Sequence, residues 1–327
     1  MRENVSSSRL TRVPPTLALA VAVVAVSTSA PLIELSQAPS SVKALYRVLF
    51  MTALVTPVAL RRNADDFARI TTRDLGIALV TGIALAAHFA LWFVSFEFTT
   101  IAASATLVQT QPLFVAFGAW ALLSERVTRQ TVVGILVAVA GAATIGLGAP
   151  TSSAAPQPLL GNGLAVGAAA MASIYVLAGR SLRQRVNLFP YVSIVYGACT
   201  VGLFGLVLYE GHDLTGYPAT EYLLFLGMAV GPGIFGHTVI NWLLERVESS
   251  VVSVSLLGEP VGSAILALAI FGEVPGLATV VGGAIALVGI GVVVWSRQSG
   301  DASDEPVDGR REAGGEVADE PQSSDSA

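Results

Sequence analysis

Charged residues and cysteine are scarce in this chain. Only 13% of the residues are charged, whereas a soluble globular domain carries about 25%. The single cysteine, Cys199, excludes a disulfide within the chain. No basic patch with interleaved aromatic residues indicates nucleic-acid binding. HExxH, CxxC and GxSxG are all missing, so we expect no enzyme activity, no catalytic residue, no metal site and no cofactor.

Apolar residues, by contrast, make up 53% of the chain. Runs near 20 residues follow one another from about Thr16 to Trp295, and about 20 helical residues cross a bilayer. A large soluble all-α protein is the alternative, but no segment shows the broad polar face that it needs. We therefore predict an all-α integral membrane protein with ten transmembrane helices. They cover about 15–37, 42–60, 75–96, 101–123, 130–149, 159–179, 190–209, 221–243, 250–271 and 275–295.

The distribution of arginine supports ten spans. With the N terminus inside, the arginine clusters near Arg61 and Arg180 fall on the cytoplasmic side. The opposite loops contain no lysine or arginine, and only Lys43 and Arg47 depart from the pattern. We therefore expect a multi-pass protein of the cell membrane with both termini cytoplasmic. The first apolar run resembles a signal peptide, but removing it would reverse this agreement, so we keep it as a span.

The chain divides into five segments by composition. We expect a cytoplasmic N-terminal segment at 1–14, five-helix repeats at 15–149 and 159–297, and an extracellular linker at 150–158 between them. Residues 298–327 are rich in Gly, Ser, Asp and Glu, so we predict a disordered acidic cytoplasmic tail.

An internal repeat underlies this division. Gln111-Pro112, Glu125, Gly134 and Gly141 match Glu259-Pro260, Glu273, Gly282 and Gly289, and each pair is separated by 148 positions (259 − 111, 273 − 125, 282 − 134, 289 − 141). Five spans per half is an odd number, so the two repeats must be inverted in the membrane. We expect both glutamates to fix helix ends and both glycine stripes to pack helices closely.

Polar side chains inside the spans are the candidates for function. A charge at the bilayer centre costs about 2.5–3.5 kcal/mol on insertion scales, so such residues face a cavity or a partner. We predict that they bind a substrate. The candidate substrate-binding residues are Glu34, Arg47, His88, Trp92, Gln111, His237, Asn241 and Glu259.

Several alternatives stay open for these residues. Glu34 either pairs with Arg47 or contacts water at the interface. Arg47 either snorkels outward or clamps an anionic group in the cavity. His88 and His237 either relay protons or hydrogen-bond between helices. His88 shares a helical face with Trp92, and His237 shares one with Asn241, because both pairs have i,i+4 spacing.

Helix breakers accompany the candidate residues. Pro112 and Pro260 would each free a carbonyl four residues back, at Val108 and Leu256, and so form either a substrate-facing notch or a packing kink. Gly231-Pro232-Gly233 predicts a second hinge, in the eighth span only. The predicted hinge or kink residues are Pro112, Gly231, Pro232, Gly233 and Pro260.

The ten spans, the two inverted halves, Arg47, the Gln111-Pro112 and Glu259-Pro260 elements and the paired glutamates together resemble the EamA-type branch of the drug/metabolite transporter superfamily. The resemblance covers about residues 14–297. It implies secondary transport of small organic solutes, often export of amino acids, metabolites or drugs, by alternating access around a central cavity. It fixes neither the solute nor the coupling ion.

Our hypothesis is therefore a secondary active transporter, and more specifically an exporter, of a small organic metabolite such as an amino acid or a drug-like solute. We expect the lipid bilayer, the solute, protons as a coupling ion and a second copy in a homodimer as partners, and no nucleic acid. Glu259 or a histidine would carry the proton. The alternatives are a polytopic membrane enzyme, which predicts polar clusters at the interface, and a non-transporting receptor or scaffold, which predicts large extramembrane elements.

Overall fold

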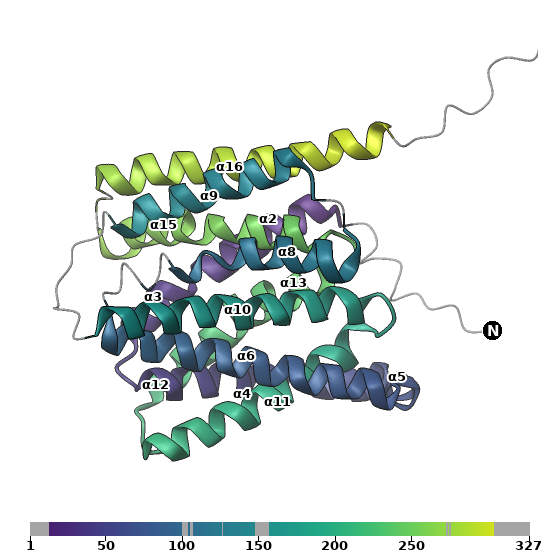
Figure 1. Cartoon of the computed structure of the whole chain (residues 1–327). Coiled ribbons are helices and arrows are strands. Elements are labelled where there is room, and N and C mark those ends of the chain that lie inside the picture. Colours follow the sequence, from purple (N-terminus) through teal and green to yellow (C-terminus); the bar gives the residue numbers. More distant parts are fainter. Residues whose placement is uncertain are drawn as a thin grey trace, which may run out of the picture.

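The protein is a bundle of helices that lie roughly along one direction (Figure 1). The computed structural model describes residues 13–99, 104, 107–125, 127–147, 157–272, 274 and 276–303. No strand occurs within these ranges, so the predicted all-α class is confirmed. The predicted N-terminal segment, the linker at 150–158 and Glu273 fall, wholly or largely, outside the described residues. Helix α16 continues through residues 298–303, which composition had assigned to the tail, because extending an existing helix requires no new nucleus.

Sixteen elements follow one another along the described chain. In the first half these are α2 (Pro15–Ser27), α3 (Ser29–Leu35), α4 (Ser40–Arg62), α5 (Ala64–Arg69), α6 (Thr72–Phe98), α8 (Gln111–Leu123) and α9 (Arg129–Leu147). In the second half they are α10 (Pro158–Arg183), α11 (Leu188–Glu210), α12 (Ala219–Met228), the π-helix η1 (Ala229–Thr238), α13 (Val239–Leu243), α14 (Ser249–Ser255), the 3₁₀ turn η2 (Leu256–Gly258), α15 (Glu259–Phe271) and α16 (Leu277–Ser303).

Seven helical stretches in the described ranges are long and apolar enough to cross a membrane. They are Pro15–Ile33, Ser40–Arg62, Thr72–Trp92, Pro158–Arg183, Leu188–Glu210, Ala219–Leu243 and Ser249–Ile270. Three shorter apolar helices, Gln111–Leu123, Arg129–Thr144 and Val280–Val293, lie at other predicted spans. The chain is thus a multi-pass membrane protein, and the count of ten remains a prediction.

Helices α9 and α16 pack through residues that correspond in the internal repeat. A Cβ atom on Gly141 would lie 2.3 Å from the backbone nitrogen of Ala286 and 2.6 Å from the oxygen of Gly282. A Cβ atom on Gly289 would meet Ala138 at 2.4 Å and Gly134 at 2.7 Å in the same way. Each contact is therefore made twice, once from each half. Residue numbers rise along α9 as they fall along α16, so the two equivalent helices are antiparallel.

A second pair of equivalent helices, α4 and α11, repeats this arrangement. The hydroxyl oxygens of Thr52 and Thr200 are 3.2 Å apart, and these residues are again separated by 148 positions (200 − 52). The Ser41 hydroxyl, near the start of α4, donates to the carboxylate of Glu210 at the end of α11. These two contacts make α4 and α11 antiparallel as well. A pseudo-twofold axis thus relates the halves wherever equivalent helices touch.

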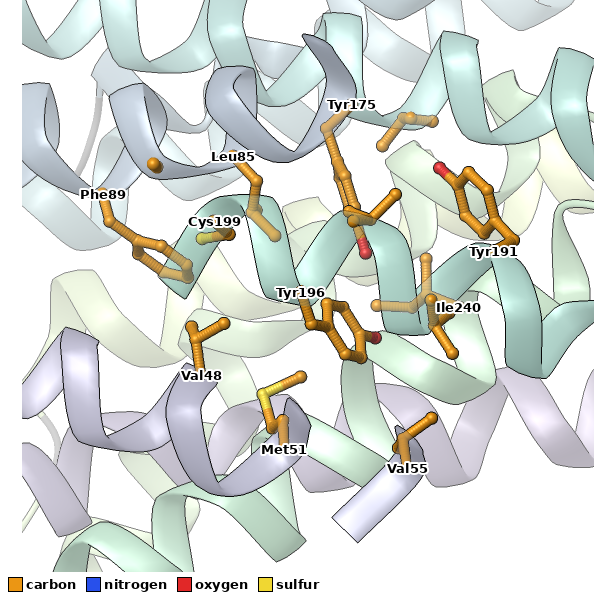
Figure 2. Close-up of a cluster of buried hydrophobic side chains, with 14 of the residues drawn as sticks. Val48, Met51, Val55, Leu85, Phe89, Tyr175, Tyr191, Tyr196, Cys199 and Ile240 are labelled. Carbon is orange, nitrogen blue, oxygen red and sulfur yellow. The ribbon is translucent and has the colours of Figure 1, made fainter. Parts of the chain in front are cut away.

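The apolar core lies mainly between α4, α6, α10 and α11. Tyr191, Tyr196 and Cys199 on α11 are fully buried there together with Met51 of α4 (Figure 2). Gly233 in η1 lets the Met51 side chain approach closely, because a Cβ atom on Gly233 would lie 2.6 Å from the Met51 sulfur. The small residue therefore seats the π-helix against α4.

The two repeated prolines do not lie in the middle of helices, as the sequence had predicted. Pro112 occupies the first turn of α8, after a turn at residues 109–110. Pro260 occupies the first turn of α15, after η2. A proline in a first turn removes no helical hydrogen bond, because that N–H has no intrahelical partner. The prolines therefore start new helices, and the interruptions precede them.

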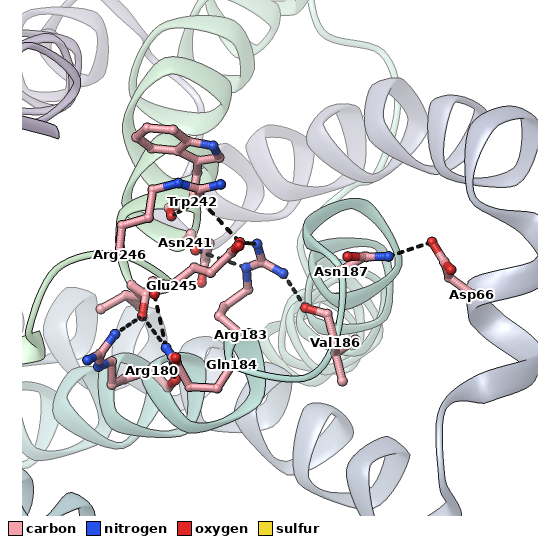
Figure 3. Close-up of polar contacts among 11 residues, drawn as sticks. Asp66, Arg180, Arg183, Gln184, Val186, Asn187, Asn241, Trp242, Glu245 and Arg246 are labelled. Atoms are coloured by element: carbon pink, nitrogen blue, oxygen red, sulfur yellow. Dashed lines mark hydrogen bonds and ion pairs between the residues drawn. The ribbon is translucent and has the colours of Figure 1, made fainter. Parts of the chain in front are cut away.

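Ion pairs gather at the end of the bundle where α10 ends (Figure 3). Glu125 accepts hydrogen bonds from the backbone and hydroxyl of Ser249 at 3.2 and 2.9 Å and pairs with Arg180 at 3.0 Å. It thereby caps the start of α14, as predicted for a glutamate that fixes a helix end. Arg183 bonds to Glu245, to the Val186 carbonyl and to the Asn241 carbonyl.

We expect substitution of Gly289 by Ala to destabilise the protein. The new methyl group would overlap the α9 backbone, and overpacking of this kind costs about 1–3 kcal/mol. Gly291→Ala is the matched control on the same helix, because no atom lies within 4 Å of its Cβ position. The measurement is the thermal unfolding midpoint of the purified protein in detergent. Equal midpoints for the two variants would contradict the close approach of α9 and α16.

Candidate functional site

A cavity of about 270 Å³ lies between the two halves. It is lined by side chains from α2, α3, α4, α6, α8, α10, η1, α13, η2 and α15. The polar lining residues are Ser29, Arg47, His88, Trp92, Gln109, Gln111, Tyr175, His237, Glu259 and Ser263. The apolar lining residues are Val26, Leu85, Phe89, Val108, Ala172, Val176, Ile240, Leu256 and Pro260.

The helix interruptions converge on this cavity. The break between α2 and α3 at Thr28 lies between the lining residues Val26 and Ser29. The turn at 109–110 separates Val108 from Gln111, and η2 begins at Leu256 and leads into Glu259. The π-helix η1 carries His237. Inside a bilayer, irregular backbone is tolerated where it lines a cavity or is buried in protein. The helix interruptions and the polar side chains thus indicate the same site.

A larger groove lies on the outer face of α8 and α9. It measures about 380 Å³ and is lined almost wholly by apolar side chains, including Leu113, Phe117 and Ile135. None of the described residues that line it is charged. A lipid-facing surface has this character, so the cavity between the halves is the stronger candidate for chemistry.

Arg47 is the most deeply buried charge at the cavity. Its side chain comes from α4, and the residue is only 6% exposed. One terminal nitrogen lies 3.5 Å from the Ser29 hydroxyl, and the guanidinium carbon lies 5.4 Å from the centre of the Phe89 ring. The Nε atom has no hydrogen-bond acceptor among the described residues. Of the two alternatives for Arg47, the structure places it at the cavity rather than at the membrane surface.

Glu259 faces the same cavity from the first turn of α15. No described residue donates a hydrogen bond to its carboxyl group, although the Ser27 hydroxyl donates to its backbone carbonyl at 3.3 Å. The Ser263 hydroxyl donates in turn to the Ser27 carbonyl at 3.1 Å. Gly262 permits this approach, because its Cβ position lies 2.7 Å from the Ser27 Cβ atom. The α2–α15 contact therefore fixes the backbone that carries the carboxyl group.

His88 is held in one tautomer by its neighbour on α10. Its Nδ1 atom lies 3.0 Å from the Ala168 carbonyl oxygen. A carbonyl can only accept, so Nδ1 carries the proton and the neutral ring offers Nε2 as an acceptor. The Trp92 ring stacks on the imidazole with centroids 6.0 Å apart and planes 20° apart. The i,i+4 pair predicted from the sequence therefore forms one flat wall of the cavity.

A second polar group joins α10 to η1 and α13. Asn241 donates through Nδ2 to the Tyr175 hydroxyl at 2.6 Å and to the His237 carbonyl at 2.8 Å. The Tyr175 hydroxyl lies 3.5 Å from Nδ1 of His237. Asn241 itself is fully buried and does not line the cavity. The predicted cavity role of Asn241 is therefore replaced by a supporting one, in which it orients Tyr175 and His237.

The structure brings most of the predicted site residues together. Arg47, His88, Trp92, Gln111, His237 and Glu259 all line the one cavity. Glu34 lies on α3, and its side chain is outside the described residues. The structure therefore says nothing of the predicted contact between Glu34 and Arg47. Among the described residues, no group of three or more His, Cys, Asp or Glu could hold a metal ion.

Sequence reasoning missed several lining residues, including four with hydroxyl or aromatic side chains. Ser29, Phe89, Tyr175 and Ser263 were not singled out, because each looks unremarkable in an apolar span. One signal was available for Tyr175, since the 148-residue offset pairs it with Ser27 (175 − 27). Both halves thus carry a hydroxyl group at this position, and both hydroxyls take part in contacts at the site.

We expect Tyr175→Phe to destabilise the protein by about 1–3 kcal/mol, because it removes a hydrogen-bond acceptor from the buried Asn241. Tyr191→Phe is the matched control, since the Tyr191 hydroxyl is buried with no hydrogen-bond partner among the described residues. It should leave stability unchanged or slightly raised. The thermal midpoint in detergent measures both. A larger loss for Tyr191→Phe would refute the assigned network.

Comparison with known proteins agrees with the two-repeat arrangement. A family model described as the EamA-like transporter family matches residues 15–147 and again residues 159–295. A solved structure described only as "Crystal structure of protein" superposes with a TM-score of 0.74 at 20% identity, over 87% of this chain and 98% of that one. At that identity the likeness shows the fold alone.

Curated relatives are similar over part of their length. The uncharacterized transporter YetK of Bacillus subtilis (strain 168) is 30% identical over 147 residues, 44% of this chain and 42% of that protein. An uncharacterized transporter of Archaeoglobus fulgidus is 28% identical over 195 residues, 59% and 68% of the two chains. A probable terminal-alkyne amino-acid exporter of Streptantibioticus cattleyicolor is 26% identical over 207 residues, 63% and 67%.

Proposed function

The chain belongs to the EamA-like transporter family, and from this premise we propose that it is a secondary active transporter that exports a small organic solute by alternating access. The observation that carries the proposal is the cavity between the halves, whose wall holds a buried arginine and a carboxyl group that are not paired with each other. Groups left unsatisfied in a low-dielectric site favour binding of a polar ligand.

The size of the cavity supports a small solute. Pockets for drug-sized ligands measure about 300–1,000 Å³, and this one measures about 270 Å³. A metabolite of the size of an amino acid is compatible with that volume. The relative from Streptantibioticus cattleyicolor, named a probable amino-acid exporter, favours the same solute size.

We propose ten spans in two inverted repeats, with both termini in the cytoplasm of a cell-membrane protein. The antiparallel packing of α9 on α16 and of α4 on α11 supports inversion. The arginines at the end of α10 lie at the same end of the bundle as the start of α6 and the end of α8, as the Arg185–Asp74 and Arg180–Glu125 ion pairs show. A shared arginine-rich end is what cytoplasmic loops produce.

Cysteine labelling in intact cells tests this topology. The only native cysteine is buried, so an introduced cysteine reports alone. We expect Thr215→Cys, in the exposed loop after α11, to react with a membrane-impermeant maleimide. Ala64→Cys, which is also at an exposed position and follows α4, should react only after permeabilisation. Labelling of Ala64→Cys in intact cells, or protection of Thr215→Cys, would reverse the orientation.

Solute counterflow in proteoliposomes tests transport itself. Purified full-length protein is reconstituted and offered a panel of amino acids, nucleosides, carboxylates and cationic drugs. We expect exchange of at least one small polar or amphipathic solute and no exchange of large cationic drugs. Empty liposomes and protein-free detergent extracts are the controls. Absence of exchange across the panel, with folded protein present in the vesicles, would argue against the proposed function.

Proton coupling is a separate expectation that centres on Glu259. A glutamine at this position keeps the shape of the side chain but cannot take up a proton at neutral pH. We expect Glu259→Gln to abolish the response of solute flux to an imposed pH gradient, whereas Glu210→Gln, outside the cavity, should leave it intact. Flux and pH response equal to those of the unaltered protein would remove Glu259 from the coupling step.

A further inference from the structure

Arg47 has too few partners for a charge buried to this extent. The residue is 6% exposed, its Nε atom is unbonded, and its one hydrogen bond to a described side chain is the long contact to Ser29 at 3.5 Å. A guanidinium presents its donors as a planar fork that fits a carboxylate with two parallel hydrogen bonds. The Phe89 ring at 5.4 Å supports the cation but accepts no such bonds. The donors at the cavity therefore await an anionic group.

Glu259 supplies the opposite charge without closing on Arg47. Both residues line the cavity and interact electrostatically, yet no ion pair within 4.0 Å joins them. Two opposite charges that share a small cavity normally lower their energy by pairing. Here the backbone of each is fixed, Arg47 about two turns into α4 and Glu259 at the α2–α15 contact. The gap between them is a place for a molecule that carries both charges.

The internal repeat does not duplicate either charge of the cavity, so the cavity has one positive side and one negative side. The position equivalent to Arg47 is Val195 (195 − 47 gives 148), and the position equivalent to Glu259 is Gln111. Each half therefore contributes one charge, and neither charge has a copy related by the pseudo-twofold axis. A ligand that matches the pair has only one favourable orientation, and it bridges the two halves.

We propose that the cavity binds a zwitterion, with its carboxylate on Arg47, its ammonium group on Glu259 and its apolar part against the aromatic wall of Phe89, Trp92 and Tyr175. The inference rests on the proposed transport function and specifies the solute class for that same cavity. Affinity requires both charged groups of the ligand. The carboxylate pairs with Arg47 and the ammonium group pairs with Glu259, and neither group can pair with the other residue. Transport requires both as well, since only such a solute meets the fixed charge of each half.

Matched ligands that lose one charge at a time test the proposal. On the leucine and phenylalanine skeletons, the amino acid, its amide and its deaminated acid differ only in the poles. Each is offered as a competitor in counterflow, and its binding is measured by thermal shift of the purified full-length protein. We expect the amino acid to bind about 10- to 100-fold more tightly than either partner compound, as charge-assisted hydrogen bonds of about 1.5–3 kcal/mol imply.

Two substitutions then give a crossed pattern. Arg47→Gln should weaken binding of the amino acid about 10- to 100-fold and leave binding of the amide, which lacks a carboxylate, unchanged. Glu259→Gln should weaken binding of the amino acid and leave binding of the deaminated acid unchanged. A general loss of folding would weaken every ligand equally, so the crossed pattern separates recognition from structure. Arg47→Lys, which keeps the charge without the fork, should restore part of the affinity.

The internal repeat supplies a positional control. In the double variant Glu259→Gln/Gln111→Glu the cavity keeps its net charge, but the carboxylate moves to the equivalent position of the other half. We expect no recovery of amino-acid binding. Full recovery would show that net charge rather than position governs binding, and would overturn the assignment of Glu259.

The outcomes distinguish this inference from the function on which it rests. Exchange of a solute that lacks one pole, at an affinity equal to that of its zwitterion, leaves transport in place and overturns the zwitterion site. Loss of the pH response in Glu259→Gln without a change in ligand preference does the same. Failure to exchange any member of the wider panel removes the transport function itself.

Discussion

The backbone of a membrane-spanning helix must satisfy its own hydrogen bonds, because the bilayer core offers no water to do so. This constraint governs where the chain departs from regular α-helix. Its interruptions at Thr28, at residues 109–110, along η1 and at η2 all flank the cavity between the halves. By contrast, α4, α6, α10 and α11 each run without interruption for 23 residues or more. Irregular backbone is thus concentrated where polar side chains can compensate for it.

The packing contacts between the two halves are symmetric, whereas the residues of the cavity are not. Equivalent helices meet directly at α9–α16, and the equivalent residues Thr52 and Thr200 meet between α4 and α11; these contacts are apolar or neutral. The charged and aromatic residues of the cavity, by contrast, are not matched between the halves: Arg47 corresponds to a valine and Trp92 to Ile240 (240 − 92). A symmetric frame therefore encloses an asymmetric binding surface, and a polar ligand meets different chemistry on each side.

Much of this arrangement could be predicted from the sequence. Low charge and apolar runs dictate membrane helices, and the constant offset dictates a repeat, because both depend only on local residue type and spacing. Arg47, His88 and Glu259 could be placed at a cavity, since a charge or imidazole within a span needs a polar surrounding. The positions of Pro112 and Pro260 were misjudged, because a proline fits equally well in a first turn, and only tertiary packing decides where that turn falls.

The remaining features depend on contacts between distant segments. The π-helix around Gly233 requires Met51 and Val26 to pack against bare backbone, and neither is near it in sequence. Asn241 was expected at the cavity wall, but its amide is held inside the bundle by Tyr175 and the His237 carbonyl. The glycine contacts of α9 and α16 have a further consequence. An interface in which Gly141 meets Ala286 as Gly289 meets Ala138 has the self-complementary form of a twofold homodimer, here joined within one polypeptide. In a homodimer one substitution would alter both equivalent contacts. Here a substitution at Gly141 or at Gly289 alters only one of them, and the equivalent contact stays unchanged.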